Sequence, residues 1–169
     1  MINVQRKLVL AAIAVTLGIA GSVSYAFDQS SVDNMEQVVI SIKTNPLKDP
    51  EPACVALQIG INLLMDLNGT VLPADKVILF PTIDGVELIN PDNQINKRKK
   101  PKLDCDTPAG ESTASLSQLL ETFVELDGEV VICPLCANSR GITDPTQGKM
   151  GTAEDIHNLF LYADKVIDF

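Results

Sequence analysis

Four short apolar runs alternate with segments of helical periodicity, and this alternation limits the fold more than any other feature of the chain. Helices are expected at 52–68, 115–126 and 152–162, with a short one from Ala137 to about Gly141; strands are expected at 38–42, 76–80, 129–133 and 165–169. Runs of β-branched residues are typical of strands buried on both faces, as in parallel sheets. The pattern predicts a three-layer α/β sandwich with a mainly parallel sheet covered by helices on both faces.

Each expected helix carries an apolar face that should point toward the sheet. The face predicted for 115–126 consists of Leu116, Leu119, Leu120 and Phe123, and that for 152–162 of Ile156, Leu159 and Phe160. For 52–68 the sequence predicts a broad, mostly buried face made of Val55, Ile59 and Leu63, widened by Leu57, Ile61 and Leu64.

The third apolar run ends in a cysteine pair, Cys133-Pro134-Leu135-Cys136. Cys133 is expected where a buried strand turns toward a helix, at the sheet edge where α/β proteins place reactive groups. A thiolate near a helix N-terminus is stabilised by partial positive charge. A pair so close in sequence closes too small a loop to stabilise a fold much. We therefore interpret Cys133 as a nucleophilic or sulfur-accepting thiol; the alternative is an inert buried cysteine at a strand end. Cys136 is interpreted as a resolving thiol or the partner in a simple structural or oxidised pair.

The two remaining cysteines also fall in strand-to-helix connections. Cys54 opens the helix after the first strand, and Cys105 lies in the loop after the second, so the topology gathers all four sulfurs at one edge of the sheet. Cys54 and Cys105 are expected to form a structural disulfide or to be free loop thiols. Thiolates suit zinc or cuprous ions, but a zinc signature needs two closely spaced ligand pairs and one exists here. We expect no metal and no cofactor.

Other polar residues are weaker candidates for a site. Arg140 follows the cysteine pair and is a candidate to hold a thiolate or an anionic sulfur substrate; pairing with a surface carboxylate is the alternative. His157, the only histidine, would be the imidazole of any Cys–His mechanism, yet its mid-helix position favours a partly exposed residue. The basic run 97–100 is typical of a solvated loop.

The N-terminal segment predicts export. Arg6 and Lys7 precede an uncharged apolar stretch, and Ser24-Tyr25-Ala26 fits the small-x-small cleavage pattern, so residues 1–26 are interpreted as a signal peptide and 27–169 as one domain. The expected location is periplasmic or secreted. The apolar stretch is short for a membrane span, so no membrane association is expected after cleavage.

Charge and composition restrict the partners. The net charge is −9, and removal of Arg6 and Lys7 with the signal would make it −11. An acidic chain repels phosphate backbones, and tryptophan is absent, so nucleic acid is not an expected partner. Apolar residues make up 46% of the chain, which favours a homo-oligomer.

Several motifs, taken together, resemble those of one known family. The chain resembles the DsrE/DsrF-like (TusD-like) sulfur-relay proteins in four motifs. These are Ala56–Gly60 with the later Asn68-Gly69, a strand and turn at Leu79–Val86, the cysteine pair followed by Arg140-Gly141-Ile142, and the ending Ala163–Phe169. The resemblance covers most of residues 38–169.

The resemblance implies a flavodoxin-like fold, subunits that assemble into oligomers, and a persulfide carried on Cys133. It implies that sulfur donor and acceptor proteins, or small thiols, are the partners. The alternative is a protein whose cysteines bind a metal or form a thiol redox pair without sulfur transfer. A bond from Cys133 to Cys136 would favour a redox or structural role, unless reduction restored sulfur uptake.

Overall fold

A computed structural model describes residues 36–65, 74–93, 95, 104–105 and 114–169 of the chain. Contacts divide the chain into two units, 1–33 and 34–169, and the described residues all belong to the second. The expected signal peptide, the Asn68-Gly69 pair of the family resemblance and the basic run 97–100 lie outside the described residues.

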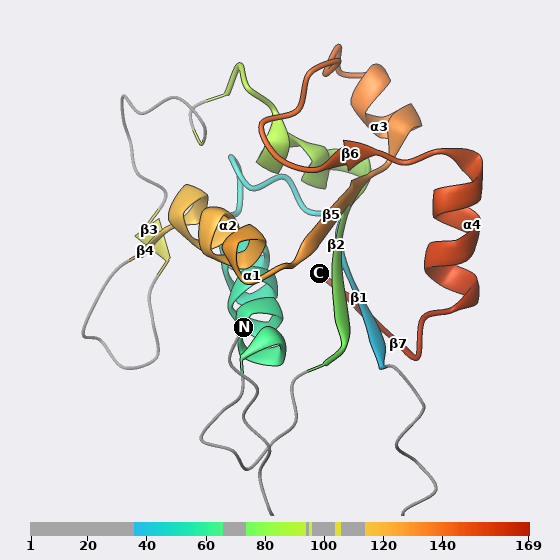
Figure 1. The fold of residues 1–169 in the computed structure, drawn as a ribbon. Coiled ribbons are helices and arrows are strands. Elements are labelled where there is room, and N and C mark those ends of the chain that lie inside the picture. The colour runs from blue at the N-terminus through green and yellow to red at the C-terminus, as the bar shows by residue number, and fades with distance from the viewer. Residues whose placement is uncertain (1–35, 66–73, 94, 96–103, 106–113) are drawn as a thin grey trace, which may run out of the picture. The chain divides into compact units, whose positions relative to one another are not determined.

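A five-stranded parallel sheet forms the centre of this unit (Figure 1). Its strands are β1 (Gln37–Ile42), β2 (Lys76–Pro81), β5 (Glu129–Ile132), β6 (Lys149–Met150) and β7 (Lys165–Asp168), in the spatial order β6-β5-β2-β1-β7. β1 lies between β2 and β7, with Val39 opposite both Ile78 and Val166. A separate antiparallel ladder joins β3 (Asp104–Cys105) to β4 (Ala114–Ser115).

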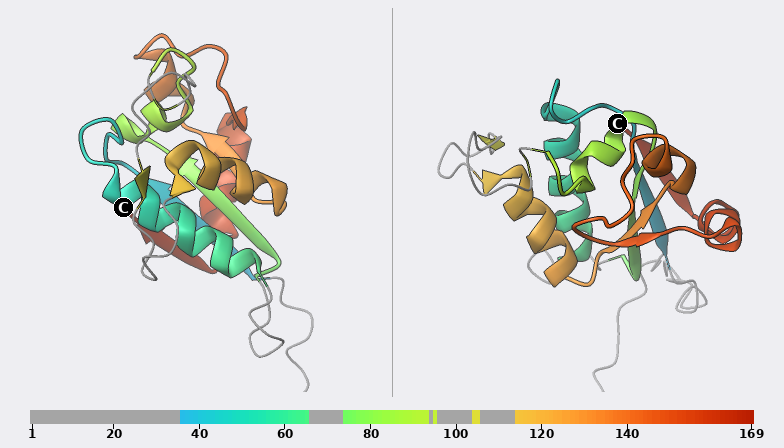
Figure 2. Two further views of the ribbon diagram at one scale, coloured as in Figure 1. Left: turned by 90° about the vertical axis from the view of Figure 1, so that its left-hand side faces the viewer. Right: turned by 90° about the horizontal axis from the view of Figure 1, so that it is seen from above.

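Helices cover both faces of the sheet. α1 (Glu51–Leu64) and α2 (Leu116–Glu125) lie on one face, and α4 (Ala153–Leu161) lies on the other (Figures 1 and 2). Two shorter elements, the 3₁₀ helix η2 (Ile83–Ile89) and α3 (Pro134–Asn138), directly follow β2 and β5. The predicted α/β class and flavodoxin-like three-layer sandwich are confirmed.

The core has two parts, one on each face of the sheet. The larger cluster contains Ile40, Leu57, Leu79 and Phe123 with their neighbours under α1 and α2. The smaller one lies under α4, and its buried members are Val39, Ile78, Phe80, Val131 and Leu159. Successive residues of β1 and β2 thus point to opposite clusters, which explains why these strands are apolar throughout.

The apolar face predicted for the first helix was right for Leu57 and Ile61, which are buried, but wrong for Val55. α1 ends at Leu64 rather than at 68, and Val55 is 42% exposed. Its buried face includes the small residues Ala53, Ala56 and Gly60. A Cβ at Gly60 would lie 2.8 Å from the Phe123 ring, so the missing side chain is what lets α1 approach α2 closely. A prediction based on large apolar residues overlooks the small residues that are also buried on this face of α1.

The other two long helices were predicted more closely. α2 buries Leu116, Leu119, Leu120 and Phe123, and Ser115 and Gln118 form a capping box at its start. In α4, Leu159 is buried and Ile156 partly buried, but Phe160 is 47% exposed and does not point inward as predicted. Its ring instead packs edge-on against Phe80, with centroids 5.4 Å apart, at the rim of the smaller cluster. Within the described residues, no helix is long and apolar enough to span a membrane.

Candidate functional site

Cys133 lies at the carboxyl end of β5, next to β2. Its amide donates to the Pro81 carbonyl over 3.1 Å and so extends the pairing of β5 with β2 by one residue. Its own carbonyl accepts from the Ala137 amide at 3.0 Å, which starts α3. Pro134 occupies the first helical position, where no amide hydrogen is needed. The helix therefore begins at Pro134, not at Ala137 as predicted, and it includes Cys136.

Cys133 and Cys136 are joined by a disulfide across this single helical turn, with their Cα atoms 5.3 Å apart. Both residues are partly exposed. Cys133 packs against the smaller core cluster and Cys136 against the larger, so the bond lies at the edge of the sheet between the two layers. The structure therefore has Cys133 and Cys136 as an oxidised pair, which is one of the two arrangements predicted for Cys136.

The Arg140-Gly141-Ile142 sequence closes the turn that carries the pair. The Ile142 amide donates to the Ala137 carbonyl at 3.0 Å and the Gly141 amide to the Asn138 carbonyl at 3.1 Å, which is the hydrogen-bond pattern of a Schellman motif. Gly141 has φ +71°, a conformation that suits glycine, and Ile142 is buried. Backbone hydrogen bonds and a buried side chain thus fix this turn independently of the disulfide.

Arg140 joins α3 to η2. Its guanidinium pairs with Asp84, lies 3.9 Å from a Glu87 carboxylate oxygen, and donates to the Cys136 carbonyl at 3.1 Å. It also donates to the Ser139 hydroxyl at 3.1 Å. Of the two predicted roles, the structure has carboxylate pairing, and through it Arg140 holds the backbone at Cys136. The Arg140 contacts described here include no sulfur atom.

Thr82, the residue after β2, contacts the disulfide through its side chain. Its hydroxyl lies 3.5 Å from the Cys136 sulfur. The Thr82 amide donates to the Ile42 carbonyl at 2.9 Å, and the Thr82 carbonyl accepts from Gly85 at 2.8 Å, so the residue is held at both ends. The next residue, Ile83, has φ +49°, which for a β-branched residue costs about 1–2 kcal/mol.

Sequence reasoning missed Thr82, Asp84 and Glu87 as site residues, although it noted a strand and turn at Leu79–Val86. These residues follow β2, and they join the site because β2 and β5 are adjacent and parallel. That adjacency was the missing information: two strands separated by a helix and a long loop need not be neighbours. Once β2 is known to pair with β5, the residues that follow β2 become candidates for a site around Cys133.

Cys54 and Cys105 form the second disulfide, which confirms one of the two predicted alternatives. Their Cα atoms are 5.6 Å apart, and the residues are 9% and 4% exposed. Cys54 lies in the first turn of α1 and Cys105 in β3, so this bond ties the β3–β4 ladder to the first helix. All four cysteines belong to connections after strands, as expected, but they form two separate pairs.

The remaining candidate residues are not drawn together. His157 is exposed on α4. Among the described residues, no three side chains of His, Cys, Asp or Glu converge in a way that could hold a metal ion.

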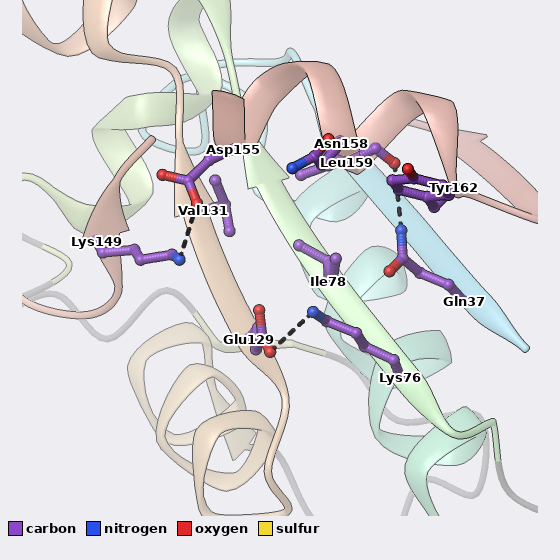
Figure 3. Close-up of a pocket in the computed structure, with 10 residues that line it drawn as sticks. All are labelled: Gln37, Lys76, Ile78, Glu129, Val131, Lys149, Asp155, Asn158, Leu159 and Tyr162. Atoms are coloured by element: carbon purple, nitrogen blue, oxygen red, sulfur yellow. Dashed lines mark hydrogen bonds and ion pairs between the residues drawn. The ribbon is translucent and has the colours of Figure 1, made fainter. Parts of the chain in front are cut away.

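A hollow of about 270 Å³ lies on the α4 face of the sheet (Figure 3). Gln37, Lys76 and Glu129, the first residues of three strands, line it, whereas Cys133 follows the opposite end of β5. Lys76 pairs with Glu129 across its wall at 3.1 Å, and Lys149 pairs with Asp155 at 3.1 Å. Hydrogen bonds from the Thr152 backbone and hydroxyl lower the pKa of Asp155 to about 2. These charges are already paired, so the hollow is a weaker candidate than the cysteine site.

The fold and the site define a class: a parallel three-layer α/β protein with a cysteine pair at the carboxyl end of a central strand. The comparisons narrow this class to a family. The family model described as "DsrE/DsrF-like family" matches residues 52–169. The chain therefore belongs to the DsrE/DsrF-like family, whose membership connects it with sulfur relay in general.

A solved structure supports the same assignment. The crystal structure of the ychN protein from E. coli is 25% identical, with a TM-score of 0.55, and the match covers 80% of this chain and all of that one. The curated proteins searched include no match.

Proposed function

We propose that this is an exported sulfur-handling protein in which reduced Cys133 accepts a sulfane sulfur and passes it on. The observation that carries the proposal is the Cys133–Cys136 pair at the carboxyl end of β5, in a chain of the DsrE/DsrF-like family. The pair is partly exposed, while the other two cysteines are buried in a disulfide. A sulfur donor can therefore approach Cys133 and Cys136 more readily than Cys54 and Cys105.

The transfer is a thiol exchange reaction. The Cys133 thiolate attacks the outer sulfur of a donor hydropersulfide, R–S–SH; the donor S–S bond breaks, R–S⁻ leaves, and Cys133 carries –S–SH. An acceptor thiolate then attacks that outer sulfur, which leaves the acceptor as a persulfide and Cys133 as a thiolate. Electrons balance in each step because one S–S bond breaks as another forms.

Cys136 supplies a competing route. Its thiolate attacks the inner sulfur of the Cys133 persulfide, HS⁻ leaves, and the Cys133–Cys136 disulfide forms. The product of that step is a disulfide between the same two cysteines that are bonded in the structure, and an external dithiol reductant is needed to reopen it. Thr82 and Arg140 position Cys136 for this reaction through its sulfur and its carbonyl.

The second candidate function is thiol redox exchange without sulfur transfer. The disulfide itself favours it, because a bonded pair one helical turn apart is what a dithiol oxidant or reductant uses. The two candidates predict different products after reduction: an added sulfur on Cys133 in one, and electron exchange alone in the other.

The test is intact mass measurement of the signal-free protein. After mild reduction of Cys133–Cys136, incubation with inorganic polysulfide should add one sulfur atom. The Cys136→Ser variant should retain the persulfide longer, because no resolving thiol remains, and Cys133→Ser should not gain sulfur. The Cys54→Ser/Cys105→Ser double variant is the matched control and should still load. No sulfur on the reduced Cys136→Ser variant, or loading that survives Cys133→Ser, would reject the carrier role; metal that co-purifies stoichiometrically would favour the binding alternative.

Export to the periplasm or outside the cell is part of the proposal. The signal-like segment 1–26 motivates it, and two disulfides in one chain are typical of oxidising compartments. Expression of the full chain with cell fractionation should give a mature protein that begins at Phe27. An uncleaved chain in the cytoplasmic fraction would reject this part alone.

We also propose that the protein forms homo-oligomers. Phe160, Leu161 and Tyr162 at the end of α4 are 47–65% exposed, and Val166 on β7 is 49% exposed. Exposed apolar side chains that lie together are typical of subunit interfaces. Light scattering at micromolar concentration should give more than one subunit per particle, and Leu161→Asp should shift the distribution toward monomer. A monomeric wild-type protein would reject the assembly.

A further inference from the structure

Two large apolar side chains beside the Cys133–Cys136 disulfide are turned toward solvent. Leu135, which lies between the two cysteines in α3, is 81% exposed. Ile83 is 53% exposed and directly follows Thr82, whose hydroxyl is 3.5 Å from the Cys136 sulfur. α3 and η2, which carry these residues, are in contact.

Folding does not account for an isoleucine at position 83. The backbone there is left-handed, with φ +49°, which β-branched residues avoid. The turn is imposed by its neighbours: Thr82 is hydrogen-bonded to Ile42 and Gly85, and a Cβ at Gly85 would collide with the Ile42 carbonyl. Glycine at 83 would satisfy this backbone without strain, and a half-exposed isoleucine recovers little of the cost by burial.

Folding does not account for a leucine at position 135 either. A side chain that is 81% exposed contributes little to the core, yet it occupies the middle of the reactive turn. So exposed a side chain projects from the surface instead of enclosing a space. Small ligands are held in concave pockets, whereas projecting apolar groups are buried by the surface of another protein.

Charge around the pair points to the chemistry of that partner. Arg140, the cation next to Cys136, is already paired with Asp84 and lies near Glu87. An anionic small thiol therefore finds no free guanidinium at this position, whereas an apolar surface finds two unburied side chains.

Resting on the function proposed above, we propose that Ile83 and Leu135 form an apolar docking surface for a partner protein whose exchanging cysteine is flanked by apolar residues. The partner thiolate attacks one sulfur of the Cys133–Cys136 bond, a mixed disulfide forms, and the other cysteine leaves as a thiolate. With the pair reduced, the same contact brings a persulfide donor or acceptor to Cys133.

Two tripeptides of equal length test this docking surface: acetyl-Leu-Cys-Leu-amide and acetyl-Ser-Cys-Ser-amide. The measurement is the rate at which each opens the Cys133–Cys136 bond, followed by mass mapping of the mixed disulfide. Wild-type protein should react about five- to tenfold faster with the apolar peptide, from the apolar area that the contact buries. Ile83→Gly and Leu135→Ser should each lose most of that preference and keep the rate with the polar peptide within about twofold.

Stability separates docking from damage to the fold. Ile83→Gly should keep its melting temperature close to that of wild type, because relief of the left-handed strain offsets the lost burial and the added freedom of the unfolded chain. A lost preference in a protein of unchanged stability cannot come from unfolding. Val55→Ser, which removes an exposed apolar side chain on α1, should keep the full preference.

The outcomes also separate this inference from the proposed function. No peptide preference in wild-type protein, or a preference that survives both variants, would overturn the docking surface even if polysulfide still loads Cys133. A preference that depends on Ile83 and Leu135, in a protein that takes up no sulfur, would uphold the docking surface for thiol exchange and reject only the carrier role.

Discussion

The two disulfides of this protein form the same chemical bond in opposite surroundings. Cys54–Cys105 joins positions 51 residues apart and is buried in the larger core cluster. Cys133–Cys136 spans three positions within one helical turn and is partly exposed. Removal of the first releases a long loop, whereas removal of the second releases almost no chain.

This contrast teaches that position, not bond type, separates a structural disulfide from an exchangeable one. A long-range buried bond restricts the unfolded chain strongly and is closed to reagents. A short bond at the sheet edge adds little restriction and is open to attack by a thiolate. The four predictions below test this contrast, from the largest expected effect to the smallest.

Removal of each pair should affect stability very differently. By loop-closure entropy, Cys54→Ala/Cys105→Ala should lower the free energy of unfolding by about 4 kcal/mol, and Cys133→Ala/Cys136→Ala by about 2 kcal/mol at most. Urea unfolding of the signal-free protein, monitored by circular dichroism, measures both. Equal losses for the two double variants would contradict the contrast.

Reduction should distinguish the same two bonds without mutation. With limiting dithiothreitol, Cys133–Cys136 should open first, on the order of tenfold faster or more, because Cys54 and Cys105 must be uncovered before they react. Alkylation at timed intervals and mass mapping of the labelled cysteines give both rates. In a mild denaturant the difference should shrink; identical rates without denaturant would refute the prediction.

Arg140→Ala should loosen the exchangeable region alone. It removes the link between α3 and η2 and should cost about 1 kcal/mol, the usual worth of a partly exposed ion pair with added hydrogen bonds. Amide hydrogen exchange should increase in α3 and stay unchanged around Cys54. Lys43→Ala, which breaks an exposed pair with Asp168, is the matched control and should change neither region. Faster exchange near Cys54 would show that the two regions are coupled.

Acid should destabilise α4 without changing which of the two disulfides is reduced first. The folded-state pKa of Asp155 is about 2 against an ordinary 3.8, because Thr152 donates hydrogen bonds to its carboxylate. Its stabilising contribution is therefore complete above pH 3.8 and is lost as pH falls through about 2. Unfolding measured over this range should show a smaller acid-dependent loss in Asp155→Asn than in wild type. The rate order of the two disulfides should be the same in both proteins.

The parallel sheet and the place of the cysteine pair could be predicted because both follow from local patterns. β-branched runs identify β1, β2, β5 and β7, and the chain order alone places Cys133 after the third of them. The Cys54–Cys105 pairing could not be derived, since it depends on where the loop after β2 returns.

The errors have a common physical origin in packing between elements. Gly60 lets α1 approach Phe123, so the buried face of α1 includes small residues beside its large ones. Phe160 packs at the rim against Phe80 instead of entering the core. Thr82 joins the site only because β2 lies beside β5. In each case the sequence identifies the residue but not its neighbour.

The Schellman motif after Cys136 affects the lifetime of any species formed on Cys133. Gly141 and the buried Ile142 fix the turn through backbone hydrogen bonds, so reduction of the disulfide leaves the two sulfurs near each other. Each thiol then faces its partner at a high effective concentration. If Cys133 carries sulfur as proposed, its persulfide or mixed disulfide would be short-lived. Its lifetime would be set by a competition between intramolecular closure by Cys136 and the arrival of an acceptor.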